Sequence, residues 1–165
     1  MIHLATERLF LRDWRASDLD AWAAINADPD VRRHLGDGRL ASRKDSWHMM
    51  AAASGNQALN GFGMWAAEEK ETGRLIGRIG LYLPPHFPDL EVNWLLGRPW
   101  WGKDLAHEGA VACVEHAFTR LDRPTISAFI EAANERSIRL ARRLSMAEVG
   151  EPWPGVRQFQ RRREI

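Results

Sequence analysis

The residues best suited to chemistry lie in one stretch, where a strand, a glycine-containing turn and a helix follow one another. The strand is Glu91–Leu96, the turn is Gly97–Gly102 and the helix begins at Leu105. A turn that opens into a helix presents unpaired backbone N–H groups and the positive end of a helix dipole. Both favour binding of a phosphate or pyrophosphate. We therefore expect a site for a phosphorylated cofactor at Trp101–His107.

Length and composition exclude several other classes of site. The 165 residues suit one domain, 1–165, and the net charge of +1 gives no electrostatic reason to expect a nucleic-acid partner. Cys113 is the one cysteine, so no intrachain disulfide can form, and we expect it to be a small buried hydrophobe. His107 and His116 follow helical positions without metal-ligand spacing, so no metal is assigned. No apolar run is long enough for a membrane span, and we expect a soluble cytoplasmic protein.

Hydrophobic periodicity predicts the elements that must position this stretch. The expected strands are Thr6–Trp14, Phe62–Glu69, Arg74–Leu83, Glu91–Leu96, Thr125–Glu131 and a weak terminal strand, Arg157–Ile165. The expected helices begin at the caps Ser17, Ser42 and Asn134 and at Leu105, and end near Asp28, Ala53, Met146 and Leu121 respectively.

The order of these elements predicts an α/β (α+β) fold. An antiparallel hairpin feeds one strand–helix–strand unit, whose crossover makes its two strands parallel. The expected sheet is mixed and mostly antiparallel, with six to seven strands and with helices on both faces.

Five collinear segments carry a resemblance to a known family. The chain resembles the GNAT superfamily of acyl-CoA-dependent N-acetyltransferases, and within it most closely the Rim-type ribosomal-protein N-terminal acetyltransferases. The matching segments are Thr6–Arg12, Asn26–Val31, Gly73–Gly77, Trp101–Lys103 with Ala106, and Asn134–Leu140.

This resemblance implies a single GNAT-like domain that uses acetyl-CoA as a cosubstrate and no metal. The cosubstrate would bind in a V-shaped cleft, where the central strand splays from the parallel strand that follows it. The acceptor would be an amine, either a protein N-terminus or a small molecule, and it would attack the thioester directly in a ternary complex. Such a reaction requires a neutral amine, a polarised carbonyl and a stabilised thiolate.

The resemblance also implies which residues hold the cosubstrate. Backbone groups of the strand would pair with the pantetheine arm, and the turn would hold the pyrophosphate. The strand residues are Trp94, Leu95 and Leu96, and those of the turn are Trp101, Gly102, Lys103, Asp104, Leu105 and Ala106. Asp104 replaces a glycine of the family pattern, so its carboxylate must turn to solvent if a diphosphate is to bind.

Residues of the last helix complete the implied cosubstrate site. Asn134 caps that helix, and the resemblance implies that its amide and Ser137 also reach the pantetheine. Arg142, with Arg139 and Arg143, either meets the 3′-phosphate of CoA or belongs to a solvated helix face.

Glu91 and Ser137 are the implied catalytic residues. Glu91 stands at the head of the central strand, where family members carry a glutamate base; the alternatives are an exposed charge or a structural partner of an arginine. Ser137 would donate a proton to the thiolate, because Ala141 occupies the position where many members carry a tyrosine acid. If Ser137 does not serve, water must.

Three departures from the family pattern support a second interpretation. Asp104, Ala141 and Ser145 would also be found in a GNAT-fold binding or interaction module with weakened catalysis. A third hypothesis is transfer of a larger acyl group. The acceptor remains open, because its pocket would be built from segments 30–60 and 84–90 and from the terminal hairpin, where the sequence is least informative. Tryptophans, if exposed, would allow a homodimer.

Overall fold

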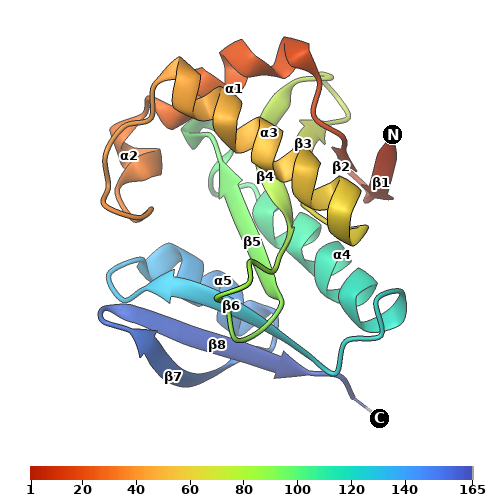
Figure 1. The fold of residues 1–165 in the computed structure, drawn as a ribbon, viewed down its shortest axis with the longest axis vertical. Helices are drawn as coiled ribbons and strands as arrows, with labels where there is room; N and C mark the ends of the chain where they lie inside the picture. The colour runs from red at the N-terminus through yellow and green to blue at the C-terminus, as the bar shows by residue number, and fades with distance from the viewer. Residues whose placement is uncertain (165) are drawn as a thin grey trace.

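A mixed eight-stranded sheet forms the centre of the computed structural model, which describes residues 1–164 (Figure 1). Its order is β1-β2-β3-β4-β5-β6-β8-β7, and every neighbouring pair is antiparallel except β5–β6. The strands are β1 (Ile2–Ala5), β2 (Leu9–Arg12), β3 (Met64–Glu69), β4 (Leu75–Tyr82), β5 (Glu91–Leu96), β6 (Thr125–Glu131), β7 (Ala147–Trp153) and β8 (Val156–Arg162).

The mixed, mostly antiparallel sheet confirms the expected fold class, but the expected six to seven strands were too few. The first expected strand, Thr6–Trp14, is in fact the second half of a hairpin, because β1 precedes it and pairs with β2. The residues between Met146 and the expected terminal strand, to which no strand was assigned, form β7, which pairs with β8. β7 is almost wholly exposed, so no apolar alternation marks it in the sequence.

Helices cover both faces of the sheet, as expected. α1 and α3 pack over β3 and β4 on one face, whereas α4 packs over β4 and β5 on the other (Figure 1). The helical segments are η1 (Ala16–Asp18), α1 (Leu19–Asn26), α2 (Pro29–Arg32), α3 (Arg43–Asn60), η2 (Arg98–Trp100), α4 (Leu105–Thr119) and α5 (Glu135–Arg143). In the described part of the chain, no helix combines the length and apolarity needed to span a bilayer.

α3 begins at its expected cap but runs well beyond the expected end at Ala53. Ser42 accepts the N–H of Asp45, and the helix ends only at Gly61, whose φ of 75° is left-handed. Within α3 only Ser46 and Met50 are fully buried. The second half of the helix therefore lacks the apolar stripe from which its length could have been predicted.

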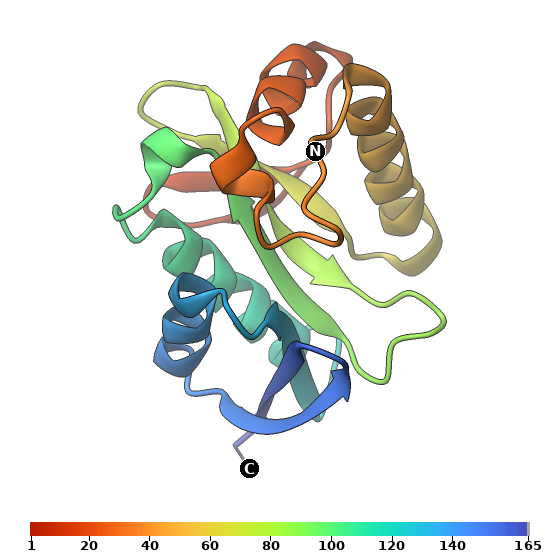
Figure 2. The same cartoon turned by 90° about the vertical axis from the view of Figure 1, so that its left-hand side faces the viewer.

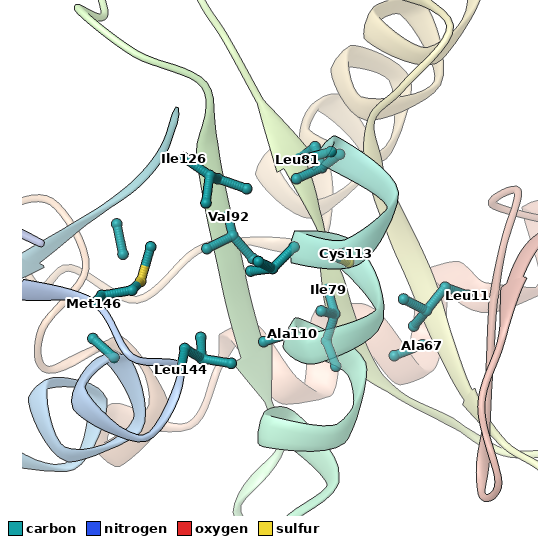
Figure 3. Packing of buried hydrophobic residues seen from close by; sticks show 14 of the residues in the cluster. Leu11, Ala67, Ile79, Leu81, Val92, Ala110, Cys113, Ile126, Leu144 and Met146 are labelled. Carbon is teal, nitrogen blue, oxygen red and sulfur yellow. The ribbon is translucent and has the colours of Figure 1, made fainter. Parts of the chain in front are cut away.

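The core that fixes α4 against the sheet lies between this helix and β4 and β5 (Figure 3). Gly109 allows the close approach, since a Cβ there would lie 2.5 Å from Cδ1 of Ile79. Cys113 is fully buried in this core, and burial raises the pKa of its thiol, so the expected inert role is confirmed. Ala110, Val114 and Ala117 share its stripe.

β5 and β6 are paired at one point only and then separate. The recorded bridge joins Glu91 and Ser127, and Ser127 donates its N–H to the carbonyl oxygen of Leu90. No further bridge follows, and the Phe129 N–H lies close enough to the Glu91 carboxyl to lower its pKa. The carboxylate therefore stands at the point where the parallel pair opens, and the expected splay is present.

Candidate functional site

The opening between β5 and β6 leads into a cavity of about 380 Å³. Its wall consists of the end of β5, the turn into α4, one face of α5, and the segment around His34 and Leu35 that follows α2. Figure 2 shows this last segment (orange) passing over β5 (green) on its way to α3. Two segments distant in sequence, α5 and the segment after α2, thus converge on the stretch expected to bind a phosphorylated cofactor.

The β5 wall offers backbone groups that no strand uses. Gly97 donates to the carbonyl oxygen of Ile76, and the register makes Leu95 the next residue bonded to β4. Trp94 and Leu96 therefore direct their N–H and C=O groups toward β6, which has already diverged. Trp101 Nε1 donates to the carbonyl oxygen of Leu96 at 2.7 Å. The groups left for a ligand are those of Trp94 and the N–H of Leu96.

The turn at the start of α4 supplies further donors to the same cavity. Gly102 and Asp104 both have left-handed backbones, with φ of 72° and 61°. The Asp104 side chain does not cap α4, so the N–H groups of its first turn, Leu105–His107, have no partner inside the helix. All three residues line the cavity. The turn therefore has the expected anion-binding form.

Asp104 occupies the N-cap position of α4, but its carboxylate neither caps the helix nor turns simply to solvent. Its two carboxylate oxygens accept hydrogen bonds from the Arg143 guanidinium at 2.7 and 3.1 Å, and this ion pair lowers the Asp104 pKa. The left-handed φ explains why a glycine is usual here, since few other residues adopt it without strain. The pair joins α4 to α5 across the edge of the cavity.

α5 presents three arginines to the cavity, spaced by three and four residues. They are Arg136, Arg139 and Arg143, whereas Arg142 points to another face of the helix and does not line the cavity. Lys103 does not line it either; its carbonyl oxygen accepts a hydrogen bond from Arg8. Arg136 was not predicted as a site residue, although it lies three residues before Arg139 and therefore on the same face of the helix.

The Arg136 guanidinium lies 3.4 Å from the centre of the Trp101 ring, which is a close cation–π stack. The ring is itself held by its hydrogen bond to Leu96. The arginine head is therefore fixed by its face, which leaves its N–H edges available for an anion.

Asn134 and Ser137 meet the β5 wall from the start of α5. Asn134 Oδ1 accepts the N–H of Ser137 at 3.2 Å, so the predicted helix cap is confirmed. Trp94 Nε1 donates to Ser137 Oγ, also at 3.2 Å, and this bond spans the opening between β5 and α5. Ser137 accepts this bond, so its own hydroxyl hydrogen remains available to a ligand. Ala141 is fully buried and does not face the cavity.

Glu91 is buried beside a second, smaller cavity of about 60 Å³. Asn93 Nδ2 donates to Glu91 Oε1 at 2.8 Å. Burial raises the Glu91 pKa to about 7, although the hydrogen bonds from Asn93 and Phe129 and the nearby charge of Arg78 oppose the rise. Glu91 is therefore not an exposed charge. It is a carboxyl that can change protonation near neutral pH, as a general base must.

The two cavities meet at the opening of the sheet. Both are lined by Trp94, Asn134 and Ser137 on one side and by His34 and Leu35 on the other. Within residues 1–164, no group of three His, Cys, Asp or Glu side chains is arranged to hold a metal ion. The site thus combines an anion-binding cavity, a strand edge, and a carboxyl of raised pKa on the far side of that edge.

Comparison with known proteins shows the family of the chain. Residues 8–147 match the model of the acetyltransferase (GNAT) domain. An uncharacterized N-acetyltransferase, p20, of Bacillus licheniformis is 30% identical over 89% of this chain and 83% of its own. A crystal structure of an acetyltransferase from Agrobacterium tumefaciens is 29% identical, with a TM-score of 0.86 over 97% of this chain and 94% of that one.

A more distant structure bears on the expected branch. A ribosomal L7/L12 alpha-N-protein acetyltransferase in complex with coenzyme A superposes with a TM-score of 0.81 over 98% of both chains, at 15% identity. That likeness shows a shared fold and does not assign the Rim-type branch. The match to the GNAT domain covers most of the chain, so the chain belongs to the GNAT acetyltransferase family and is an N-acetyltransferase.

Proposed function

We propose that this enzyme transfers an acetyl group from acetyl-CoA directly to a primary amine while both are bound. The observation that carries the proposal is the meeting of the two cavities at Trp94, Asn134 and Ser137. A thioester in the larger cavity and an amine in the smaller one would come together at that boundary. Holding both reactants in one geometry removes most of the entropic barrier to their reaction.

The residues of the larger cavity fit the parts of acetyl-CoA, which would supply the acetyl group as a thioester. The unpaired N–H groups of Leu105–His107 suit the diphosphate. Arg136 and Arg139 add positive charge on the facing helix. The strand-edge groups of Trp94 suit the amides of the pantetheine arm, which can pair there as an additional strand would.

Glu91 is the proposed base for the amine. An alkyl ammonium loses its proton reluctantly at neutral pH, because its pKa is about 10. A carboxylate with a pKa of about 7 and a hydrogen bond to Asn93 accepts that proton more readily than an ordinary glutamate. Asn93 Oδ1 is buried without a partner among the described residues, so it offers a second acceptor for the amine N–H groups.

Trp94 and Ser137 would stabilise the negative charge that develops on the thioester carbonyl oxygen and on the departing sulfur. The N–H groups of Trp94 and Leu96 that face the opening would donate to the carbonyl oxygen as it becomes negative. The Ser137 hydroxyl would donate to the departing sulfur. Its oxygen already accepts the Trp94 indole hydrogen, which orients it for that donation.

A turnover assay tests the proposal. The protein is mixed with acetyl-CoA and with primary amines of different classes, and both free CoA and acetylated amine are measured. We expect the two products in equal amounts. Release of CoA without an acetylated amine, or no turnover with any class of amine, would contradict the proposal.

Asp104→Gly should tighten CoA binding about tenfold. The substitution removes a carboxylate from beside the proposed diphosphate position and frees Arg143, while glycine accepts the left-handed backbone without strain. Calorimetric titration with CoA at low and high salt measures the change, which should shrink as salt increases.

Asp122→Gly is a matched control for this experiment. Asp122 also has a left-handed φ, of 50°, and also pairs with an exposed arginine, Arg163, but neither residue lines either cavity. CoA affinity should be unchanged in this variant. An equal gain in both variants would show that charge beside the cavity is not the cause.

Ser137→Ala should lower kcat about tenfold with little change in the KM for acetyl-CoA. A thiolate is a good leaving group, so the loss of its proton donor costs less than the loss of a base. Steady-state kinetics measure kcat and the KM for acetyl-CoA separately. Ser54→Ala, which changes an exposed helical serine, is the control. A rise in KM alone would assign Ser137 to binding rather than to proton transfer.

A further inference from the structure

Four aromatic side chains form a cluster beside Glu91, contributed by four segments of the chain. They are Tyr82 of β4, Phe87 of the β4–β5 loop, Phe129 of β6 and Trp153 of β7, here called the aromatic cluster. Phe87, Phe129 and Trp153 have mutual ring-centre distances of 5.1 Å, and Phe87 lies 5.7 Å from Tyr82. All four are half-buried, so part of each faces solvent.

One member of the aromatic cluster, Phe129, also lines the smaller cavity. Its ring packs on Phe87 and Trp153, and its backbone N–H lies close enough to Glu91 to lower the pKa of that carboxyl. Tyr82 is the direct partner of Glu91 in the β4–β5 ladder. A molecule that reached Glu91 through this cavity would therefore rest its outer part on these rings.

The loop that carries Phe87 is fixed by Asp89. The Asp89 carboxylate accepts hydrogen bonds from four neutral side chains, at 2.8 to 3.3 Å. They are Thr125 and Ser127 of β6 and Gln158 and Gln160 of β8. The ring of Phe87 is thus positioned before any acceptor binds, which reduces the entropic cost of binding against it.

The carboxylates around the aromatic cluster already have hydrogen-bond or ion-pair partners within the chain. Asp89 is satisfied by its four donors, Glu91 is bonded by Asn93 and Phe129, and Glu131 lies 3.3 Å from His34. The four rings of the cluster are half-buried, and an aromatic ring packs well against such rings in stacked or edge-to-face geometry.

The size of the smaller cavity limits the part of the acceptor that enters it. About 60 Å³ holds only a few non-hydrogen atoms. A slender aminoalkyl arm fits such a space, whereas the branched α-carbon of a peptide N-terminus brings both a carbonyl and a side chain with it. Inside the cavity the arm would meet Glu91 and the unpartnered Oδ1 of Asn93.

We infer that the acceptor is an arylalkylamine, a primary amine joined by a short unbranched chain to an aromatic ring. The ring packs on Phe87 and Trp153, and the amine nitrogen reaches Glu91. In the reaction this nitrogen bonds to the acetyl carbon, the carbon–sulfur bond breaks, and the amine proton passes to Glu91. The inference rests on the proposed function and specifies its acceptor.

A panel of amines with acetyl-CoA tests the inference through kcat/KM. The panel compares 2-phenylethylamine and tryptamine with n-butylamine, spermidine and a short peptide with a free N-terminus. We expect the two aromatic amines to exceed n-butylamine by at least about tenfold. Preference for spermidine or the peptide would overturn the inference while leaving the proposed function intact. Turnover of none of them would overturn both.

Variants of the aromatic cluster locate the preference on the structure. Phe87→Ala should lower kcat/KM for 2-phenylethylamine about tenfold and leave that for n-butylamine unchanged, because only the aromatic amine reaches the ring. Phe87→Leu, which keeps apolar volume, should recover part of the loss. Trp47→Ala, an exposed tryptophan on α3, is the control and should change neither value. Equal losses for both amines in Phe87→Ala would contradict the inference.

Discussion

Glu91→Gln should lower kcat by about 10²–10⁴-fold, the usual contribution of a general base. Glutamine keeps the size of the side chain, and its amide oxygen can still accept one of the bonds from Asn93 or Phe129. It cannot accept a proton from the amine. Acetyl-CoA binding should remain close to that of the unaltered enzyme, because Glu91 does not line the larger cavity. Turnover measurements and calorimetry on the same preparation separate the two effects.

The pH profile gives this prediction a second readout. The base acts in its ionised form, and burial places the Glu91 pKa at about 7, so kcat/KM should rise with pH through that region. Glu91→Gln should lack this rise and keep only the later one that belongs to the acceptor ammonium. Glu115→Gln, an exposed carboxylate on α4, should retain both. A rise near pH 7 that survived Glu91→Gln would assign the base to another group.

Arg12→Ala should destabilise the fold by about 3–5 kcal/mol, the cost of breaking a buried ion-pair network from one side. The Arg12 guanidinium bonds Asp18 at 2.8 and 2.9 Å and Glu68 at 2.6 Å. The side chains of Arg12 and Asp18 are only 3% and 6% exposed. Without the arginine, two carboxylates would remain close together with little solvent. The Tm of this 165-residue chain should fall by about 10 °C.

Arg15→Ala is the matched control for the stability prediction. Arg15 pairs with the same Glu68, at 3.1 Å, but its side chain is 59% exposed. Exposed ion pairs contribute about 0–1 kcal/mol, so this variant should unfold within a few degrees of the unaltered protein. Similar losses for both arginines in thermal or urea unfolding would show that burial does not determine the effect.

The sheet and its site were predictable because their signals are local and strong. β4 and β5 are apolar runs bounded by turns, and α4 follows them with an apolar stripe. The order β5, α4, β6 then predicted a crossover that makes β5 and β6 parallel. Elements that bury little left no such signal. β7 and the second half of α3 are largely exposed, and β1 is short, so neither β1 nor β7 was assigned as a strand and α3 was predicted too short.

The positions of the site residues were predictable, but several of their partners were not. Asp104 was expected to turn to solvent, and its bidentate pairing with Arg143 depends on how α4 and α5 pack, which the sequence does not specify. The same packing brings Arg136 rather than Arg142 to the cavity. Ser145 also stands where the family pattern has glycine and keeps a left-handed φ, of 59°. Asp104 and Ser145 thus both keep the left-handed backbone conformation that favours glycine, although neither is a glycine.

The aromatic cluster could not be anticipated from sequence spacing. Its rings come from four segments between Tyr82 and Trp153, and they meet only because β6 lies between β5 and β8 in the sheet. The raised pKa of Glu91 had no sequence signal either. It arises from burial at the point where β5 and β6 separate, which is a property of the assembled sheet.

Mass spectrometry of the amine after incubation with acetyl-CoA tests the central claim most directly. The reaction is run side by side with the unaltered enzyme, Glu91→Gln and Glu115→Gln, with 2-phenylethylamine and n-butylamine as acceptors. We predict an amine heavier by one acetyl group in the first and third reactions, and at least a hundredfold less in the second. Equal product in all three, or none in any, would contradict an acetyl transfer for which Glu91 is the base.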